Sequence, residues 1–599
     1  MKRSILAFAA VIVSSVPGIA QRGQSLPAAP SQTQALSKNV QVIVRYKSPP
    51  TMSQHLKAIA NGGIIKADLP MISSGAYAIP ASSVAKIAAD PEVLSIGEDR
   101  PIHALLDLTA AAVNAGTAWW VFGLDGSGIG IAVIDSGISN ADDLKAKNSW
   151  GQSRVVYRED FIHANSANDY YGHGEHVSGI IAGNGTDSTC GNCERTFRGM
   201  APGASLIDLR VLDSNGNGAD SFVIAAIQRA IQLKDRYNIR VINISLGHPV
   251  VESYKADPLC QAVELAWKAG IVVVVAAGND GRDNSFGTNG YGTIYSPGND
   301  PYVITVGAMK TMGTPQRADD LIASYSSKGP TPVDHIVKPD LVAPGNKVVS
   351  LLAPNGSLAR SYPSNLIPLD YFQWTSSHAN STSYYMLSGT SMATPVVSGA
   401  AALLLQAHPD LTADQVKARL MLTAYKSFPK SSVAYEPTTG QSFTSYYDAF
   451  TVGAGYLDIQ AALLDNHRFT GSAISPVVTY RTAARDGDGD ADDRLGSITL
   501  VCGPNTICAG STSAPSPLVA GSQSAFVGTS LWSAQAVWSN QSVWSNQSVW
   551  SNQSVWSNQS VWSNQSVWSN QSVWSNQSVW STTTIQPSAS SQIRILGEN

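Results

Sequence analysis

Short β-branched runs alternate with longer amphipathic stretches across the middle of the chain. The runs, each of which predicts a buried strand, are residues 205–211, 241–247, 271–280 and 302–306. The stretches 220–234 and 258–268 lie between these runs and have the spacing of helices. Because such alternation indicates a parallel sheet covered on both faces, we expect an α/β fold with a doubly wound, mostly parallel sheet over residues 106–466.

A smaller α+β pattern precedes this domain, over residues 38–105. Its predicted strands are residues 40–46, 75–79 and 93–96, and its predicted helices are residues 52–61 and 82–89. Taken alone, the pattern predicts a small sandwich and does not indicate its function.

The first residues have the pattern of an export signal. Residues 1–20 have a basic start, a short apolar core and small residues at the end, which is typical of a signal peptide too short to span a membrane. A spacer rich in Pro, Ser and Gln follows at residues 21–37. We therefore expect a secreted protein, extracellular or associated with the cell surface.

Composition and charge give no indication of a nucleic-acid or membrane partner. The net charge of the 599-residue chain is −4, with 14% charged residues in nearly balanced numbers, so nothing points to nucleic acid or to an anionic membrane. No run after the signal peptide is long and apolar enough for a transmembrane helix.

The candidate nucleophile is Ser391, in a Gly-Thr-Ser turn before the apolar run 396–405. Its hydroxyl would lie at a helix N-terminus, where free N–H groups and the macrodipole favour developing negative charge. Pro395 fits the first turn of such a helix. On local sequence alone a Ser/Thr helix cap is the commoner structure, so a base and an acid elsewhere must decide.

Both groups are present upstream. Asp135 ends a short β-branched run and is followed by a glycine, which predicts a carboxylate at the edge of a buried strand. His173 stands between glycines at the start of an apolar helix. A neutral histidine can take the proton of Ser391 and return it to a leaving amine, while Asp135 holds the imidazole in the right tautomer.

The order Asp135, His173, Ser391 resembles that of the subtilisin-like serine proteases, the subtilases. All three signature segments match, and Asn279 stands in a segment similar to the family's Ala-Gly-Asn. The resemblance implies a serine endopeptidase that acts on polypeptides and needs no cofactor for catalysis. Asn279 would then donate to the oxyanion beside the backbone N–H of Ser391.

Substrate contacts are expected at two places. Ser245, Leu246 and Gly247 look like the family's Ser-Leu-Gly edge, with which an extended peptide can pair through main-chain hydrogen bonds. Ala277 and Gly278 lie beside the predicted oxyanion donor.

The chain departs from the family pattern at three residues. His248 and Pro249 stand where a second glycine is usual, which is expected to crowd the substrate subsites. Glu175 replaces a threonine, and its charge would raise the pKa of His173.

A metal site at His173 and His176 is not favoured. Their spacing differs from that of zinc proteases and no third ligand is nearby, so we expect no catalytic metal and a packed structural His176. The acidic run 486–493 suits structural calcium or a solvated linker, and these alternatives stay open.

Five cysteines are present. Cys190 with Cys193, and Cys502 with Cys508, are close enough in sequence for local disulfides, which would leave Cys260 unpaired. Metal binding by the Cys-x-x-Cys pair is the alternative, and the sequence does not give the connectivity.

Beyond residue 466 we expect a linker at 467–530, hexapeptide repeats at 531–581 and a tail at 582–599. Val-Trp-Ser-Asn-Gln-Ser recurs seven times, and because six is even, an extended chain places every Trp on one face. We therefore expect a repetitive β-type tail of stacked short strands. It would contact polysaccharide or the cell envelope, or else form a stalk without a ligand.

The resemblance also implies that residues 38–105 are an inhibitory propeptide, removed by self-cleavage within residues 103–111. The rival hypothesis is an adhesive surface protein with an idle protease-like domain. The presence of Asp135, His173, Asn279 and Ser391 together argues against it.

Overall fold

A computed structural model describes residues 39–98, 108–146, 152–285, 287–468, 471–481, 497–501 and 597–598. The chain divides into two compact units, Met1–His103 and Ala104–Asn599. Several predicted features lie outside the described residues: the signal peptide, the spacer, the acidic run, the pair Cys502 and Cys508, and the repeats.

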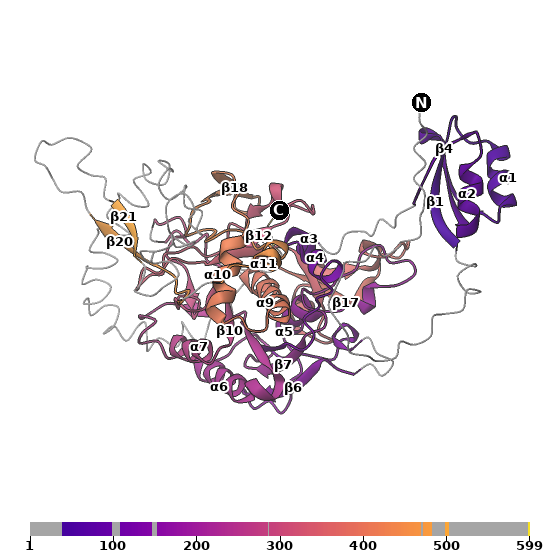
Figure 1. The fold of residues 1–599 in the computed structure, drawn as a ribbon. Coiled ribbons are helices and arrows are strands. Elements are labelled where there is room, and N and C mark those ends of the chain that lie inside the picture. The colour runs from indigo at the N-terminus through magenta and orange to yellow at the C-terminus, as the bar shows by residue number, and fades with distance from the viewer. Residues whose placement is uncertain are drawn as a thin grey trace, which may run out of the picture. The chain divides into compact units, whose positions relative to one another are not determined.

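The first unit contains a four-stranded antiparallel sheet in the order β2-β3-β1-β4. Its elements are β1 (Asn39–Tyr46), α1 (Met52–Ala60), β2 (Ile64–Leu69), β3 (Ser74–Pro80), α2 (Val84–Ala88) and β4 (Val93–Glu98). Both helices pack on one face of the sheet (Figure 1), where Ala58 and Ile87 join the buried Val42, Val44 and Tyr77. The predicted α+β pattern is confirmed here, except that strand β2 was not predicted.

The second unit is built on an eight-stranded sheet in the order β13-β12-β10-β8-β5-β7-β6, with β14 also paired to β12. Its strands are β5 (Gly130–Asp135), β6 (Val155–Asp160), β7 (Ser205–Arg210), β8 (Ile239–Ile244), β10 (Val272–Ala276), β12 (Ile304–Lys310), β13 (Leu321–Ile322) and β14 (Leu341–Pro344). All pairings are parallel except that of β13 with β12. The expected mostly parallel α/β sheet is therefore confirmed.

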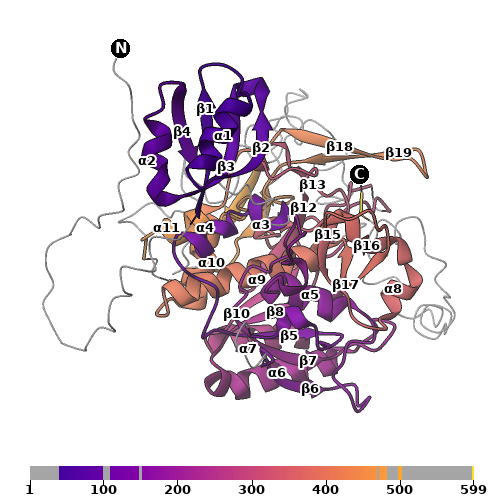
Figure 2. The same ribbon diagram turned by 90° about the vertical axis from the view of Figure 1, so that its right-hand side faces the viewer.

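Helices cover both faces of this sheet (Figures 1 and 2). One face carries α5 (His173–Ala182) and α9 (Thr390–Ala407), and the other carries α6 (Asp220–Tyr237) and α7 (Pro258–Lys268). Strands enclosed in this way are buried, as β5 and β10 are along their whole length. Contrary to the expectation from the sequence, α9 is long and apolar enough to cross a membrane, alone among the described helices, and it is mostly buried as the core helix of this unit.

The remaining elements of the second unit border this core. They are α3 (Leu108–Ala112), α4 (Ala115–Trp120), β9 (His248–Pro249), β11 (Tyr295–Ser296), β15 (Val348–Leu351), α8 (Ser357–Ser361), β16 (Leu366–Pro368), β17 (Asn380–Leu387), α10 (Ala413–Thr423), β18 (Ser431–Glu436), β19 (Gln441–Tyr446), α11 (Ile459–Leu464), β20 (Val477–Arg481) and β21 (Ser497–Val501). Cys190 and Cys193 form a disulfide and Cys260 is free and buried, as the local pairing predicted.

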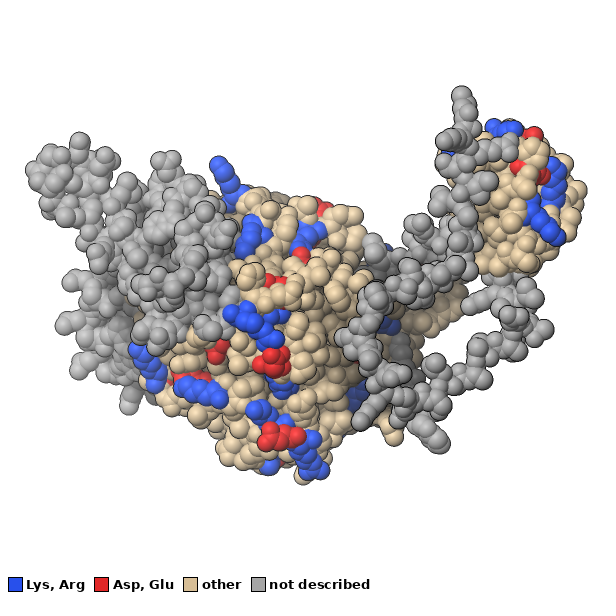
Figure 3. All heavy atoms as spheres, in the orientation of Figure 1, with Lys and Arg blue, Asp and Glu red and all other residues tan. Residues whose placement is uncertain are grey.

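Charges of both signs are interspersed on the face of the second unit seen in Figure 3. Lys and Arg stand close to Asp and Glu there, and most of the described surface in that view carries neither. This distribution agrees with the nearly balanced composition.

Candidate active site

Asp135 and His173 meet at the carboxyl edge of the parallel sheet. Asp135 is the last residue of β5 and His173 is the first of α5. His173 Nδ1 donates to Asp135 Oδ1 at 2.7 Å, and the same oxygen accepts the Ser136 N–H at 2.8 Å. The Asp135 side chain is fully buried, whereas 15% of the His173 side chain is exposed. The imidazole is therefore fixed on its Nδ1 side and reachable from solvent.

A second acid, Asp169, holds the turn that leads into α5. Its Oδ1 accepts the Gly172 N–H at 2.7 Å and the Ser136 hydroxyl at 2.9 Å, and its Oδ2 accepts the Glu175 N–H at 2.8 Å. These bonds satisfy donors at the helix N-terminus that no helical carbonyl can reach. The role of Asp169 was not predicted from the sequence, although an acid four residues before a Gly-flanked histidine is a helix-start signal.

The pKa of His173 lies above its ordinary value of 6.5. Burial lowers it, but the carboxylates of Asp135 and Asp169 act in the opposite direction and outweigh burial. The predicted influence of Glu175 has a different character, because burial raises the pKa of Glu175 itself to about 8. A carboxyl group that is mostly protonated at neutral pH supplies little charge to the imidazole.

Ser391 is the second residue of α9, at its N-terminus. Its hydroxyl donates to the main-chain carbonyl of Ser245 at 3.0 Å, and the Ser245 hydroxyl donates to the Ser391 carbonyl at 2.9 Å. Among the described hydrogen bonds, that of the Ser391 hydroxyl goes to Ser245 rather than to His173. Ser245 directly follows β8, which pairs with β5, so Ser391 lies at the same edge of the sheet as Asp135.

Asn279 is oriented by the turn that carries Ser391. Its Oδ1 accepts the Thr390 N–H at 2.9 Å and the Thr390 hydroxyl at 3.1 Å. The amide nitrogen then lies beside Gly389, where an added Cβ would come within 3.3 Å of Nδ2. Gly389 has a φ of +148°, which favours glycine. Thr390 is thus a positioning residue whose role was not predicted from the sequence.

Ser245, Leu246 and Gly247 line a pocket of about 290 Å³ together with His173. Its other lining residues are Tyr171, Leu212, Gly216, Gly218, Ala219, Asp220, Val223, His248 and Leu259. His248 Nε2 lies 3.4 Å from the Asp220 carboxylate. The pocket therefore combines apolar walls with one histidine–aspartate pair, and His248 borders it as the departure from the family pattern predicted.

The other two predicted substrate residues do not line this pocket. The Ala277 N–H donates to Val306 and its carbonyl accepts the Tyr295 N–H, both at 3.0 Å. Gly278 donates its N–H to the Thr390 hydroxyl at 3.2 Å. In this structure both residues use their backbone groups to hold the strand end that presents Asn279.

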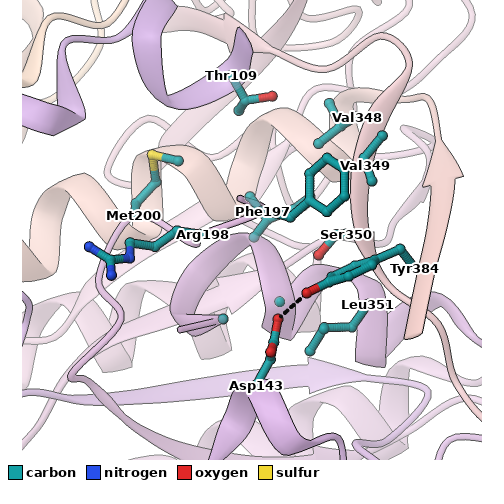
Figure 4. Close-up of a pocket in the computed structure, with 13 residues that line it drawn as sticks. Thr109, Asp143, Phe197, Arg198, Met200, Val348, Val349, Ser350, Leu351 and Tyr384 are labelled. Atoms are coloured by element: carbon teal, nitrogen blue, oxygen red, sulfur yellow. Dashed lines mark hydrogen bonds between the residues drawn. The ribbon is translucent and has the colours of Figure 1, made fainter. Parts of the chain in front are cut away.

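A smaller cavity, of about 10 Å³, lies beside the C-terminal half of α5 (Figure 4). It has room for about one water molecule, and Tyr384 donates to Asp143 at its wall with an O···O distance of 2.9 Å.

His176, also on α5, places its Nε2 at 3.1 Å from the carbonyl oxygens of Val348 and Tyr385. Burial lowers the pKa of His176 to about 3, so it is the neutral packed histidine that was expected. Among the described residues no cluster of His, Cys, Asp or Glu is arranged to hold a metal ion.

Residues 126–455 match the family model described as the Subtilase family. The chain belongs to the subtilase family. A serine protease, AprX, from Bacillus subtilis is 37% identical over 331 residues, which cover 53% of this subtilase and 66% of AprX. Subtilisin E from the same species is 33% identical over 404 residues, which cover 67% and 83% of the two chains. An extracellular serine proteinase from a Thermus species is 33% identical over 377 residues, covering 60% and 73%. By family this chain is a serine endopeptidase, a hydrolase of peptide bonds.

Proposed function

We propose that this subtilase is a secreted endopeptidase that cleaves extended polypeptides through an acyl-enzyme intermediate. Ser391 is the nucleophile, His173 the general base and acid, and Asp135 the group that orients His173. The observation that carries the proposal is the 2.7 Å hydrogen bond from His173 to Asp135 at the sheet edge where Ser391 begins α9. This chemistry requires no cofactor, and a bound calcium ion would have a structural role only.

The first half of the reaction uses the free nitrogen of His173. Because Nδ1–H is donated to Asp135, Nε2 is the atom that accepts a proton. The Ser391 hydroxyl turns away from Ser245, gives its proton to Nε2 and attacks the substrate carbonyl carbon. The electron pair of the C=O bond moves to oxygen, where Asn279 Nδ2 and the Ser391 N–H donate hydrogen bonds.

The second half returns the proton. The intermediate collapses to the acyl-enzyme as the C–N bond breaks, and His173 protonates the leaving amine. A water molecule then gives a proton to His173 and attacks the acyl carbon, so that Ser391 is released with its hydrogen restored.

Substrate binding is proposed at the backbone of residues 245–247, with a substrate side chain in the adjoining pocket. Main-chain pairing along a strand edge gives affinity without strict sequence preference, and the pocket adds selectivity. Ala277 and Gly278 support Asn279 in this scheme, since their backbone groups already have partners within the domain.

Activation is proposed to follow cleavage of residues 38–105 from the catalytic domain, within residues 103–111. Support comes from the separate compact unit Met1–His103 and its own buried core. Secretion rests on the pattern of residues 1–20 and on the relatives, one of which is named an extracellular proteinase. Residues 38–105 would act as an intramolecular inhibitor until they are cut from the catalytic domain.

Contact of residues 531–581 with polysaccharide or the cell envelope is proposed from the periodic Trp residues, and a stalk without a ligand remains the alternative. The test compares envelope polysaccharide binding by the secreted protein with and without these residues. Equal binding by both would favour the stalk.

The decisive experiment labels the secreted protein with a fluorophosphonate and locates the label by peptide mass spectrometry, with a His173→Ala variant alongside. Labelled Ser391 in the parent only, together with loss of residues up to about 105, supports a self-processing protease. An unlabelled Ser391 in processed, folded protein would contradict the proposal and favour the adhesive alternative.

A further inference from the structure

Glu598 is buried against the catalytic domain between two cations. Its carboxylate lies 2.6 Å from Arg282 Nη2 and 3.0 Å from Lys310 Nζ. The three side chains are only 5%, 10% and 5% exposed, respectively. Lys310 is the last residue of β12. This arrangement resembles a binding site rather than a surface ion pair, because all three charged groups are almost completely removed from water.

The backbone around Glu598 is held as specifically as its side chain. Its N–H donates to Asn346 Oδ1 at 3.0 Å, and its carbonyl accepts from Asn346 Nδ2 at 2.9 Å. The Ser324 N–H donates to the carboxylate at 3.0 Å, and the Ser324 hydroxyl donates to it as well. The pocket therefore recognises the backbone, the charge and the side-chain length of Glu598.

The preceding residue must be glycine. Gly597 has a φ of +81°, and an added Cβ would lie 2.5 Å from Ser388 Oγ and 2.8 Å from Lys347 Cγ. A larger side chain would meet both a backbone penalty and a clash. The pocket thus selects the dipeptide Gly-Glu.

The cationic side chains of Arg282 and Lys310 favour an anion in the pocket. Burial raises the pKa of Glu598, but Lys310 and the bonds from Ser324 outweigh it, and the carboxylate stays ionised. Arg282 has a second acidic partner, Glu436, at 3.1 Å. Emptying the pocket would remove the Glu598 carboxylate from the buried ammonium group of Lys310, at a cost in desolvation.

The wall of the pocket continues into the turn of the proposed nucleophile. Ser388, which touches Gly597, accepts the Lys347 N–H at 2.9 Å. The next residue, Gly389, donates its N–H to the Gly345 carbonyl at 2.8 Å. Ser391 follows two residues later.

We propose that Arg282, Lys310, Ser324 and Asn346 form a carboxylate-binding site for the chain's own Gly597–Glu598 segment, and that its occupation holds the turn before Ser391 in place. The segment is a structural ligand supplied more than 300 residues after Arg282. The site lies outside the proposed catalytic chemistry, and its carboxylate recognition can be tested without activity.

The first test measures the reactivity of Lys310 toward reductive methylation in the full chain, by peptide mass spectrometry. Lys310 should be protected in the parent and react at least tenfold faster in Glu598→Ala. Lys268, whose side chain is 54% exposed, is the internal reference. Asp410→Ala removes an acid from an exposed ion pair and is the matched control, with Lys310 still protected. Equal protection of Lys310 in the parent and Glu598→Ala would overturn the proposal.

The Glu598→Gln substitution removes the charge of the side chain but keeps its length and the backbone hydrogen bonds to Asn346. It therefore tests the role of the charge alone. It should also expose Lys310 and lower the thermal midpoint by about 5 °C, as expected for a buried cation that loses its anion. An unchanged midpoint and unchanged protection would show that the pocket does not require a carboxylate.

The second test supplies the ligand separately. A chain lacking residues 597–599 should regain Lys310 protection on addition of a synthetic peptide of residues 593–599. The same peptide with Glu598→Gln should require at least tenfold higher concentration, and equal potency would contradict recognition of the acid. Fluorophosphonate labelling of Ser391 should be several-fold slower in the shortened chain and recover with the peptide. Restored Lys310 protection without any change in labelling would overturn the link to the turn and leave the binding site standing.

Discussion

Asp135 controls both the orientation and the charge of His173. Its Oδ1 holds the imidazole at 2.7 Å while the Ser136 N–H holds the carboxylate, so neither partner can rotate freely. Because the carboxylate also raises the pKa of the imidazole, these two effects should be lost together when Asp135 is changed.

The activity of this subtilase should fall as the pH decreases through a value above 6.5, since His173 must be neutral to accept a proton and its pKa is raised. Asp135→Asn should move this midpoint downward and lower kcat by about 10⁴-fold. The measurement is kcat/KM against pH for both proteins. A variant with reduced kcat and an unmoved midpoint would show that Asp135 does not set the pKa.

Asn279→Ala should lower kcat by about 10²–10³-fold, roughly 2.7–4 kcal/mol, with little change in KM. Asn279→Asp keeps an acceptor for the Thr390 N–H but lacks the donor, so it should be at least as slow. Steady-state kinetics on one peptide substrate would compare them. A rise in KM at constant kcat would mean that Asn279 binds substrate instead.

Glu175 should make stability depend on pH in an unusual direction. Its pKa is 4.5 ordinarily and about 8 in the folded protein because of burial, so the folded state binds more protons than the unfolded state between these values. The free energy of unfolding should therefore decrease as the pH rises from 4.5 toward 8, by about 4 kcal/mol in total from this group.

Glu175→Gln, which cannot ionise, should remove that slope. Urea unfolding at pH 5, 6.5 and 8 in a Ser391→Ala background would measure it without self-digestion. Parallel stability curves for the two proteins would show that Glu175 does not titrate in this range.

At the scale of elements, strand β9 brings His248 to the pocket. Pro249 pairs with Tyr295 and His248 with Ser296, so the imidazole stands at the pocket wall near Asp220. Where the family usually has a second glycine, this chain has a residue of a two-residue strand, and its backbone is less free than that of a glycine.

His248→Ala should raise kcat/KM several-fold for peptides with a bulky apolar residue in this pocket, and leave peptides with glycine there unchanged. Asp220→Asn is the matched control, because it removes the neighbouring charge without opening space. A peptide series that differs at one position provides the readout. Equal effects of both variants would assign the selectivity to charge rather than volume.

The sequence predicted elements well where a strong period met a buried environment. Strands β5, β8, β10 and β12 and helices α6, α7 and α9 were placed from such periods. Strand β2 was missed because its residues are almost all exposed, which leaves no alternation to detect.

Side-chain positions followed a similar rule. The pairing of Asp135 with His173 was expected from the resemblance to the subtilases, and the position of Asp135 at the sheet edge from its place at the end of a strand. The roles of Asp169 and Thr390 were not, since they act through hydrogen bonds to backbone groups whose positions no local pattern gives.

At the scale of the molecule, buried charges join segments that are far apart in the chain. Asp340, fully buried, accepts from Lys338 at 2.7 Å and lies 3.2 Å from Lys417 of α10. It also accepts the Thr305 N–H at 2.8 Å and the Ser475 hydroxyl at 2.6 Å. Such contacts depend on the finished fold, so the sequence could not predict them, nor that of Glu598.

Asp340→Asn should destabilise the catalytic domain by about 3–5 kcal/mol, because two buried lysine side chains lose their common anion. Urea unfolding at pH 7 in the Ser391→Ala background measures the loss. Asp410→Asn breaks an exposed pair with Arg468 and should cost less than about 1 kcal/mol.

The same pair of variants gives a pH test with a definite sign. Burial alone would raise the pKa of Asp340, but Lys338 and Lys417 lower it below 3.8. The stability that Asp340 contributes is therefore present above pH 3.8 and lost as the pH falls through the folded-state pKa. The difference between the parent and Asp340→Asn should shrink only in that acidic range. A difference that already disappears between pH 7 and 5 would show that the carboxylate is not held ionised by the two lysines.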